Sequence, residues 1–243
     1  MCSSDLPEHR KYRGLNLVSE ETKTQTNQIQ TAVFAVLGLL LAFSFSMALS
    51  RFDARKQALV EETNALGTVY LRTQLLPAPQ RATEVALLRH YVDARLASAR
   101  PTWYQDATLK TQTSDLQQRM WSQAVSAAQQ DPRSIPTGLF VQSLNDAIDA
   151  QGRRDAARLN YLPGSALYLL FAASILAMGI LGYRSGLGAR GRSALGTVLL
   201  ALVVALVVLI ILDFDQPYQG LITISQQRLI DLRQSMGTGA PGP

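Results

Sequence analysis

The sequence predicts an all-α integral membrane helical bundle, in which one long helix continues from the membrane into a soluble helical domain. Three stretches of the chain, residues 29–50, 159–183 and 193–212, contain no charged side chain. Each has about 20 residues or more, the length that an α-helix needs to cross the hydrocarbon core of a bilayer. The apolar residues between these stretches recur at helical spacing, and no segment shows the alternation typical of a strand.

The first apolar stretch has a rival interpretation as a signal peptide, because "SMALS" loosely resembles a cleavage site. We favour a transmembrane helix, since the preceding segment is long and mixed in charge and the apolar run exceeds a typical signal core. No proline occurs from residue 28 to residue 76, so the same helix is expected to continue into water. Pro77 and Pro79 end it, because proline lacks the N–H group and clashes with the preceding turn.

Residues 51–158 are expected to form a soluble helical domain. After the long helix, the apolar spacing predicts helices over residues 80–99, 103–130 and 138–160. The segment "DPRSIPTG" between the last two contains two prolines and a glycine, which is typical of a turn. Pro163 then opens the second membrane helix, where first-turn N–H groups have no helical partner in any case.

The remaining segments are polar. Residues 1–28 are interpreted as an N-terminal loop, residues 184–192 as a basic loop, and residues 213–243 as a polar C-terminal tail that ends in a disordered "GTGAPGP". The start "MCSSDL" matches what a common sequencing adapter encodes in one reading frame. We therefore interpret the start as truncated or artefactual, against the alternative of a genuine polar start.

The connectivity sets which segments share a side of the membrane. If three helices cross, residues 51–158 and the tail lie on one side, and the N-terminal segment and the basic loop lie on the other. The three arginines of "YRSGLGARGR" favour a cytoplasmic basic loop by the positive-inside rule. Basic residues also crowd the opposite border, so the orientation stays open.

Composition and motifs argue against several classes of function. The net charge is +5, but arginines lie at membrane borders or alternate with acids, so no nucleic-acid partner is expected. The single cysteine excludes an intrachain disulfide, and neither histidine has a metal-ligand partner at a suitable spacing. Adjacent Glu61 and Glu62 point about 100° apart on a helix and are interpreted as solvated or ion-paired. We therefore expect no enzyme, no metal and no cofactor.

Charged residues gather where two predicted membrane helices leave the bilayer. Asp213 and Asp215 lie at the C-terminal end of the third helix, where the helix dipole disfavours acids unless a cation compensates. The same border carries Arg51, Asp53 and Arg55. We hypothesise that Asp213 or Asp215 pairs with Arg51 or Arg55, either to fix helix packing or to line an ion entrance.

One face of the first membrane helix has two interpretations. Ser46 and Ser50 are four residues apart and share a face, which Asp53 continues into water, while Leu39 and Phe43 form a neighbouring apolar row. Small and hydroxyl side chains at this spacing are typical of helix–helix packing in membranes. The same pattern also suits a pore wall with a hydrophobic constriction.

Three blocks of sequence carry a resemblance to a known family: "GLLLAFSFSMALSRFDARKQALVEETNALGTVYLRTQLLP", "LNDAIDAQGRRDAARL" and "ILDFDQPYQGLITISQQRLIDL". They resemble the bestrophin-like bacterial membrane proteins of the DUF4239 family over about residues 29–233. That family usually has one more membrane helix near its N-terminus. The resemblance to bestrophins themselves is more distant.

Bestrophins are pentameric ion channels, mostly anion-conducting, whose second membrane helix lines the pore with an aromatic or aliphatic neck. The resemblance implies that Phe43 is a neck residue, that the chain forms a homo-oligomer, a pentamer by analogy, and that small ions are its cargo. It also implies a cytoplasmic location for residues 51–158. The Trp-Trp pair that bestrophins carry after this helix is absent here, where "RFDAR" stands.

Two hypotheses follow. The first is a multi-pass protein of the bacterial inner membrane, in contact with lipid, that forms an oligomeric ion channel lined by Leu39, Phe43, Ser46 and Ser50. The alternative is a non-conducting membrane scaffold or signalling protein whose helical domain binds a partner.

Overall fold

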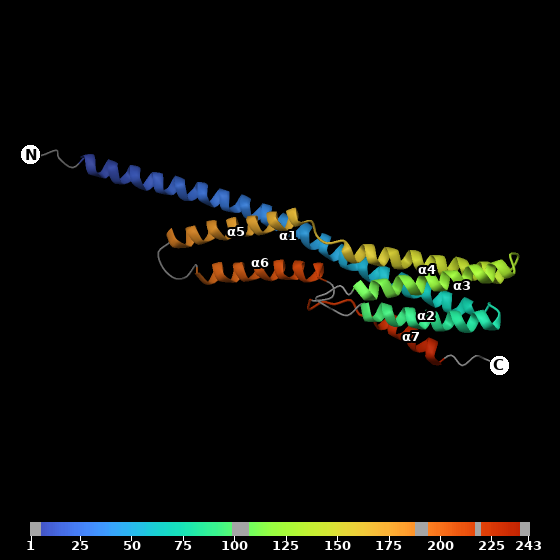
Figure 1. Cartoon of the computed structure of the whole chain (residues 1–243). Helices are drawn as coiled ribbons and strands as arrows, with labels where there is room; N and C mark the ends of the chain where they lie inside the picture. The colour runs from blue at the N-terminus through green and yellow to red at the C-terminus, as the bar shows by residue number, and fades with distance from the viewer. Residues whose placement is uncertain (1–5, 99–106, 188–193, 217–219, 239–243) are drawn as a thin grey trace, which may run out of the picture. The chain divides into compact units, whose positions relative to one another are not determined.

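The computed structural model describes residues 6–98, 107–187, 194–216 and 220–238. This part of the chain is helical with no strand, as predicted. The helices are α1 (Leu6–Thr73), α2 (Ala78–Ser98), α3 (Ala107–Gln130), α4 (Ile135–Leu159), α5 (Gly164–Leu187), α6 (Ala194–Asp215) and α7 (Gln227–Thr238), labelled in Figure 1. The chain divides into two units, described in turn below.

Helix α1 is continuous over 68 residues. The prediction of a loop was wrong for residues 6–28, because α1 already begins at Leu6, while residues 1–5 lie outside the described residues. The polar segment has only Pro7 and Gly14 as helix breakers, and a proline in the first turn is compatible with a helix because its missing N–H has no partner there. After Thr73 the chain turns through residues 74–76 and reaches Pro77.

Among the residues that the structure describes, three helices contain segments long and apolar enough to cross a membrane, within Asn27–Thr73, Ile135–Tyr183 and Leu195–Asp215. The first unit consists of Met1–Ala48 and Leu162–Leu212, and therefore holds the first part of α1 with α5 and most of α6. Here α1 and α5 line an apolar cavity of about 500 Å³, which includes Ile29, Ile175 and Tyr183. The described part of the predicted basic loop begins as helix, since α5 extends to Leu187; residues 188–192 lie outside the described residues.

The second unit consists of Leu49–Tyr161 and Asp213–Pro243, and is called the helical domain below. In it α2 packs against α3 and α7, and α3 packs against α4, as the neighbouring ribbons in Figure 1 show. The later part of α1 adds Leu66 and Val69 to the same core. The buried core residues of the other helices include Leu88, Tyr91, Val92, Leu116, Met120, Phe140, Leu144, Leu229 and Met236.

Helix α4 begins three residues earlier than the sequence suggested. The side chain of Ser134 accepts a hydrogen bond of 3.3 Å from the backbone N–H of Thr137, which caps the helix, and Pro136 occupies the first turn. Residues 103–106 of the predicted third helix lie outside the described residues, and α3 begins at Ala107.

The C-terminal tail contains a helix that the sequence analysis did not predict. Leu229 and Met236 on α7 are fully buried, and Leu232 between them packs on the core at the i, i+3, i+7 spacing of one helix face. The low average hydropathy of the segment concealed this apolar stripe. Residues 239–243, which end the predicted disordered tail, lie outside the described residues.

Candidate functional site

A cluster of polar and aromatic side chains lies where α1 enters the helical domain. We call it the border cluster and define it as Arg51, Phe52, Arg55, Tyr161, Phe214 and Asp215. At its centre is Arg55, of which only 2% is exposed. Its guanidinium donates hydrogen bonds to three backbone carbonyl oxygens: Ala157 at 3.2 Å, Asn160 at 2.8 Å and Phe214 at 3.1 Å.

These three acceptors belong to the C-terminal ends of two helices. Asn160 is the C-cap residue of α4, and Phe214 lies in the last turn of α6. The last carbonyl groups of a helix have no partner within it and carry the negative end of the helix dipole. The planar guanidinium, with five N–H donors, can serve several of them at once. Arg55 therefore joins α1 to both helix ends.

The rest of the border cluster surrounds this guanidinium. The carboxylate of Asp215 lies 3.8 Å from it, and the ring of Tyr161 lies 5.4 Å from its central carbon, within the range of a cation–π contact. Arg51 donates a hydrogen bond to the carbonyl oxygen of Tyr161. The rings of Phe52 and Phe214 pack with centroids 5.3 Å apart.

The two acids at the end of α6 have different environments. Asp215 contacts Arg55, whereas the Asp213 carboxylate accepts hydrogen bonds from the backbone N–H groups of Leu221 at 2.7 Å and Ile222 at 2.9 Å. A side-chain carbon on Gly220 would clash with the Asp213 carboxylate, which would have to shift for any residue other than glycine at this position. Of the hypothesised pairings, the structure thus brings together Arg55 and Asp215. Asp213 instead holds the turn that follows the helix.

A second polar cluster lies deeper in the helical domain, and we call it the Glu62 cluster. Glu62 on α1 is fully buried and accepts hydrogen bonds from Arg95 on α2, at 2.7 and 3.2 Å, and from Arg154 on α4, at 2.5 Å. Arg95 also contacts Asp155 at 3.1 Å, and Arg154 reaches Gln226, just before α7, at 2.9 Å. The cluster thus connects α1, α2, α4 and the approach to α7.

The charges of this cluster compensate one another. Burial by itself would lower the pKa of Arg95, but Glu62, together with Tyr91 and Asp155, outweighs that effect and raises the pKa above its ordinary value. An unpaired buried charge would be strongly unfavourable, so each guanidinium depends on the carboxylate. The sequence analysis missed Arg95 and Arg154, because they lie 33 and 92 residues from Glu62 and no local spacing connects them.

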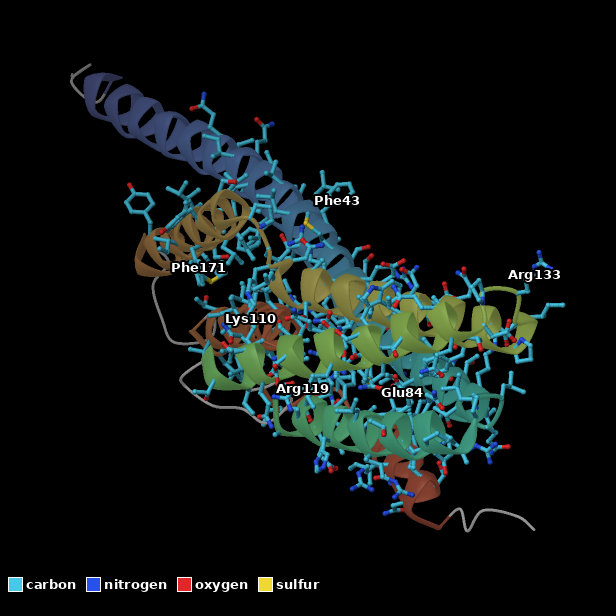
Figure 2. All side chains as sticks on the ribbon, turned by 45° about the vertical axis from the view of Figure 1, so that its right-hand side comes forward. Phe43, Glu84, Lys110, Arg119, Arg133 and Phe171 are labelled. Atoms are coloured by element: carbon cyan, nitrogen blue, oxygen red, sulfur yellow. The ribbon has the colours of Figure 1, made fainter. Side chains whose placement is uncertain are left out.

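The four residues predicted to line a pore are all exposed in the single chain. In the first unit, Leu39 and Phe43 are 57% and 65% exposed and Ser46 is exposed, while Ser50 at the start of the helical domain is exposed as well. The buried residues of this stretch of α1 are Leu37, Ser44 and Ala48. Figure 2 shows Phe43 projecting from the side of α1 that faces away from α5, the helix that carries Phe171.

The face of α1 with the predicted pore residues is therefore opposite the face that its own chain covers. At 100° per residue, Leu37, Ser44 and Ala48 lie within a narrow arc, and Leu39, Phe43 and Ser46 lie about 180° away from it. Asp53 is exposed too, and lines a cavity of about 570 Å³ with Lys56 and Arg228.

Comparison with known proteins decides the family. The family described as the Bestrophin-like domain matches residues 10–229. The chain belongs to the bestrophin-like family. With three helices in its described part that are apolar enough to cross a bilayer, it is a bestrophin-like membrane protein. A search of curated proteins found no match.

Solved structures share the fold of this bestrophin-like chain. A bacterial bestrophin homologue from Klebsiella pneumoniae, in a form with one mutation, is 14% identical with a TM-score of 0.73, over 90% of this chain and 91% of that one. Another single-mutation form of this homologue is 14% identical with a TM-score of 0.72, and the match covers 86% of this chain and 87% of that one. A structure described as a membrane protein is 13% identical with a TM-score of 0.72, over 85% and 84%.

Within the described residues, no three His, Cys, Asp or Glu side chains come together in a way that would hold a metal ion. Both clusters are built around arginine guanidinium groups that contact carboxylates or carbonyl oxygens. Their chemistry is suited to fixing helices in place, since every buried guanidinium in them is bonded to an acid or to a carbonyl oxygen.

Proposed function

We propose that this bestrophin-like protein is a multi-pass protein of the bacterial inner membrane that assembles from identical copies into an ion-conducting pore. The observation that carries the proposal is the exposed face of α1 at Leu39, Phe43 and Ser46, opposite the face that its own chain buries. A scaffold that used these residues for internal packing would cover them with its own helices.

A closed ring of copies would place this face around the symmetry axis. Phe43 would then supply a ring of aromatic side chains, and hydrophobic rings of this kind form constrictions that control the passage of ions. Ser46 and Ser50 would supply hydroxyl groups nearer the helical domain. Five copies is the number that the resemblance to bestrophins implies, and lipid would cover the remaining apolar surface of α5 and α6.

The border cluster supports the same proposal by fixing the end of the pore helix. Arg55 bonds α1 to the C-terminal ends of α4 and α6, so the helix cannot rotate there without breaking three hydrogen bonds to carbonyl oxygens. A pore-lining helix needs a defined rotation, because a change of 100° would replace one set of lining residues by the next.

The test is ion flux from liposomes that contain the purified full chain, together with a Phe43→Ala variant. We expect a larger flux or a changed ion selectivity in the variant, because the constriction is widened. Phe171→Ala on α5 is the matched control, since it makes the same change at another exposed aromatic residue, and it should leave the flux as in the unmodified protein. Native mass spectrometry of the same samples measures the number of copies.

A non-conducting scaffold is the second candidate, and exposed apolar residues on the helical domain favour it. Leu71 and Ile135 are 64% and 76% exposed there. If a folded, oligomeric protein conducts no small ion, or if Phe43→Ala and Phe171→Ala behave alike, the pore is ruled out. The scaffold is then the better proposal.

A further inference from the structure

A second buried glutamate lies in the core of the helical domain, away from the clusters described above. Glu84 on α2 is 1% exposed and belongs to the same buried helix face as Leu88, Tyr91 and Arg95. Figure 2 labels it on α2. Its Oε1 atom is buried and has no hydrogen-bond partner. One turn earlier, Gln80 also has a buried Oε1 without a partner, although its amide donates to Gln130 at 2.7 Å.

The charged groups on the elements around this part of α2 are bonded elsewhere. On α2 itself, Arg81 donates to the carbonyl of Leu76, and Arg89 to that of Met236 on α7. At the end of α1, Arg72 donates to the carbonyl of Leu139, and on α7 Arg233 pairs with Asp93. On α3 Arg119 pairs with Asp115, and after α3 Asp131 accepts from the backbone N–H of Arg133. Burial raises the pKa of Glu84 to about 8, and no neighbouring charge contributes to that shift.

The two buried glutamates of this domain therefore differ in charge state for a structural reason. Glu62 is bonded to two guanidinium groups, which stabilise a carboxylate in the core. No cation among the described residues pairs with Glu84, and an unpaired carboxylate in such a place is so unfavourable that the group binds a proton instead. A neutral carboxylic acid is compatible with the packing of α2 against α3 and α7, whereas the ionised form is not.

We propose that Glu84 makes the packing of α2 dependent on pH: α2 remains packed in the helical domain while Glu84 carries its proton, and opens locally when that proton is lost. The proposal does not depend on ion conduction. An acid whose pKa is raised on folding contributes stability that is fully present below its ordinary value of 4.5 and is lost as the pH rises towards 8. Above about pH 8, Glu84 is ionised in both the folded and the opened state, and its contribution to stability is fully lost.

Amide hydrogen exchange of the full chain, read by mass spectrometry on peptides from α2 between pH 5.5 and 9, tests this proposal. The unmodified protein and a Glu84→Gln variant are compared at each pH, so that the intrinsic pH dependence of exchange cancels in their ratio. We expect the ratio of local opening, unmodified over variant, to rise by roughly tenfold for each pH unit up to about pH 8 and then to level off. A ratio that stays constant over this range would overturn the proposal.

Asp93→Asn is the matched control, because it makes the same acid-to-amide change on the same helix at an exposed position. Its opening ratio should not change with pH, since solvent and Arg233 stabilise the charge of Asp93. A second variant, Glu84→Leu, removes the proton-binding group and the unpartnered oxygen together. If glutamine itself disturbs the fold, the leucine variant should still exchange without the pH-dependent rise, and retention of that rise would contradict the role of Glu84.

Discussion

Arg55 donates a hydrogen bond of 2.8 Å to the carbonyl oxygen of Asn160, 105 residues further along the chain and at the C-cap of α4. The same guanidinium bonds the last turn of α6. One side chain thus holds the ends of two helices against the helix on which the proposed pore depends.

Replacing Arg55 by alanine is expected to destabilise the protein, because the buried carbonyl oxygen of Phe214 and the part-buried ones of Ala157 and Asn160 lose this donor. A buried acceptor costs about 1–3 kcal/mol when it is left unsatisfied. We expect the melting temperature of the full chain in detergent to fall by on the order of 5–10 °C. Lysine should restore only part of the loss, since one ammonium group cannot reproduce the planar fork of the guanidinium.

Arg119→Ala is the control for this prediction. Arg119 pairs with Asp115 on the surface of α3, and an exposed pair of this kind contributes about 0.3–0.5 kcal/mol. Asp215→Asn should lie between the two variants, because it keeps every hydrogen bond from Arg55 to the carbonyl oxygens. Equal melting temperatures for Arg55→Ala and Arg119→Ala would show that the border cluster does not stabilise the fold.

The adjacent glutamates of α1 allow a test of the Glu62 cluster with a neighbouring control. Glu62→Gln leaves Arg154 buried without its acidic partner and leaves Arg95 with Asp155 alone, which is expected to lower the free energy of unfolding by about 3–5 kcal/mol. Glu61→Gln removes only an exposed pair, 3.6 Å from Arg153, and is expected to cost about 0–1 kcal/mol. Chemical denaturation followed by circular dichroism measures both. A similar cost for the two variants would contradict the burial of Glu62.

Gly220→Ala is expected to disrupt the turn after α6, because the added carbon would lie 2.7 Å from Cγ of Asp213. Displacing well-packed groups in this way costs about 1–3 kcal/mol. A double-mutant cycle identifies the cause: in an Asp213→Ala background the clash is absent, so the alanine at position 220 should cost less. If the destabilising effects of Gly220→Ala and Asp213→Ala simply add in the double mutant, the turn does not depend on the contact between residues 213 and 220.

Most of the fold was accessible from the sequence because its signals are local. Charge-free stretches predicted the membrane helices, and Pro77 marked the end of α1 to within a few residues. The helix dipole argument also led to the correct border, since an acid at the end of α6 does contact an arginine of α1. The pairing between the two acids and the two arginines was not decided, because helical spacing does not show which acid contacts which arginine.

The parts that escaped prediction depend on distant partners. Glu61 and Glu62 are indistinguishable by local spacing, and only the fold, by bringing Arg95 and Arg154 to one side of α1, buries the second of them. The helical character of the polar N-terminal segment and of α7 was missed for the opposite reason. The N-terminal segment is polar but contains few helix breakers, and α7 is polar on average but carries an apolar stripe. In both segments the overall polarity suggested a loop.

Arg55 donates to three main-chain carbonyl oxygens, and this has a consequence for how such a protein can diverge. Any residue at positions 157, 160 or 214 presents the same oxygen, so substitutions there leave the bonds to the guanidinium in place. Relatives can therefore exchange these side chains without a compensating change at the arginine. A search for correlated substitutions would not detect these three hydrogen bonds, although they join α1 to two other helices.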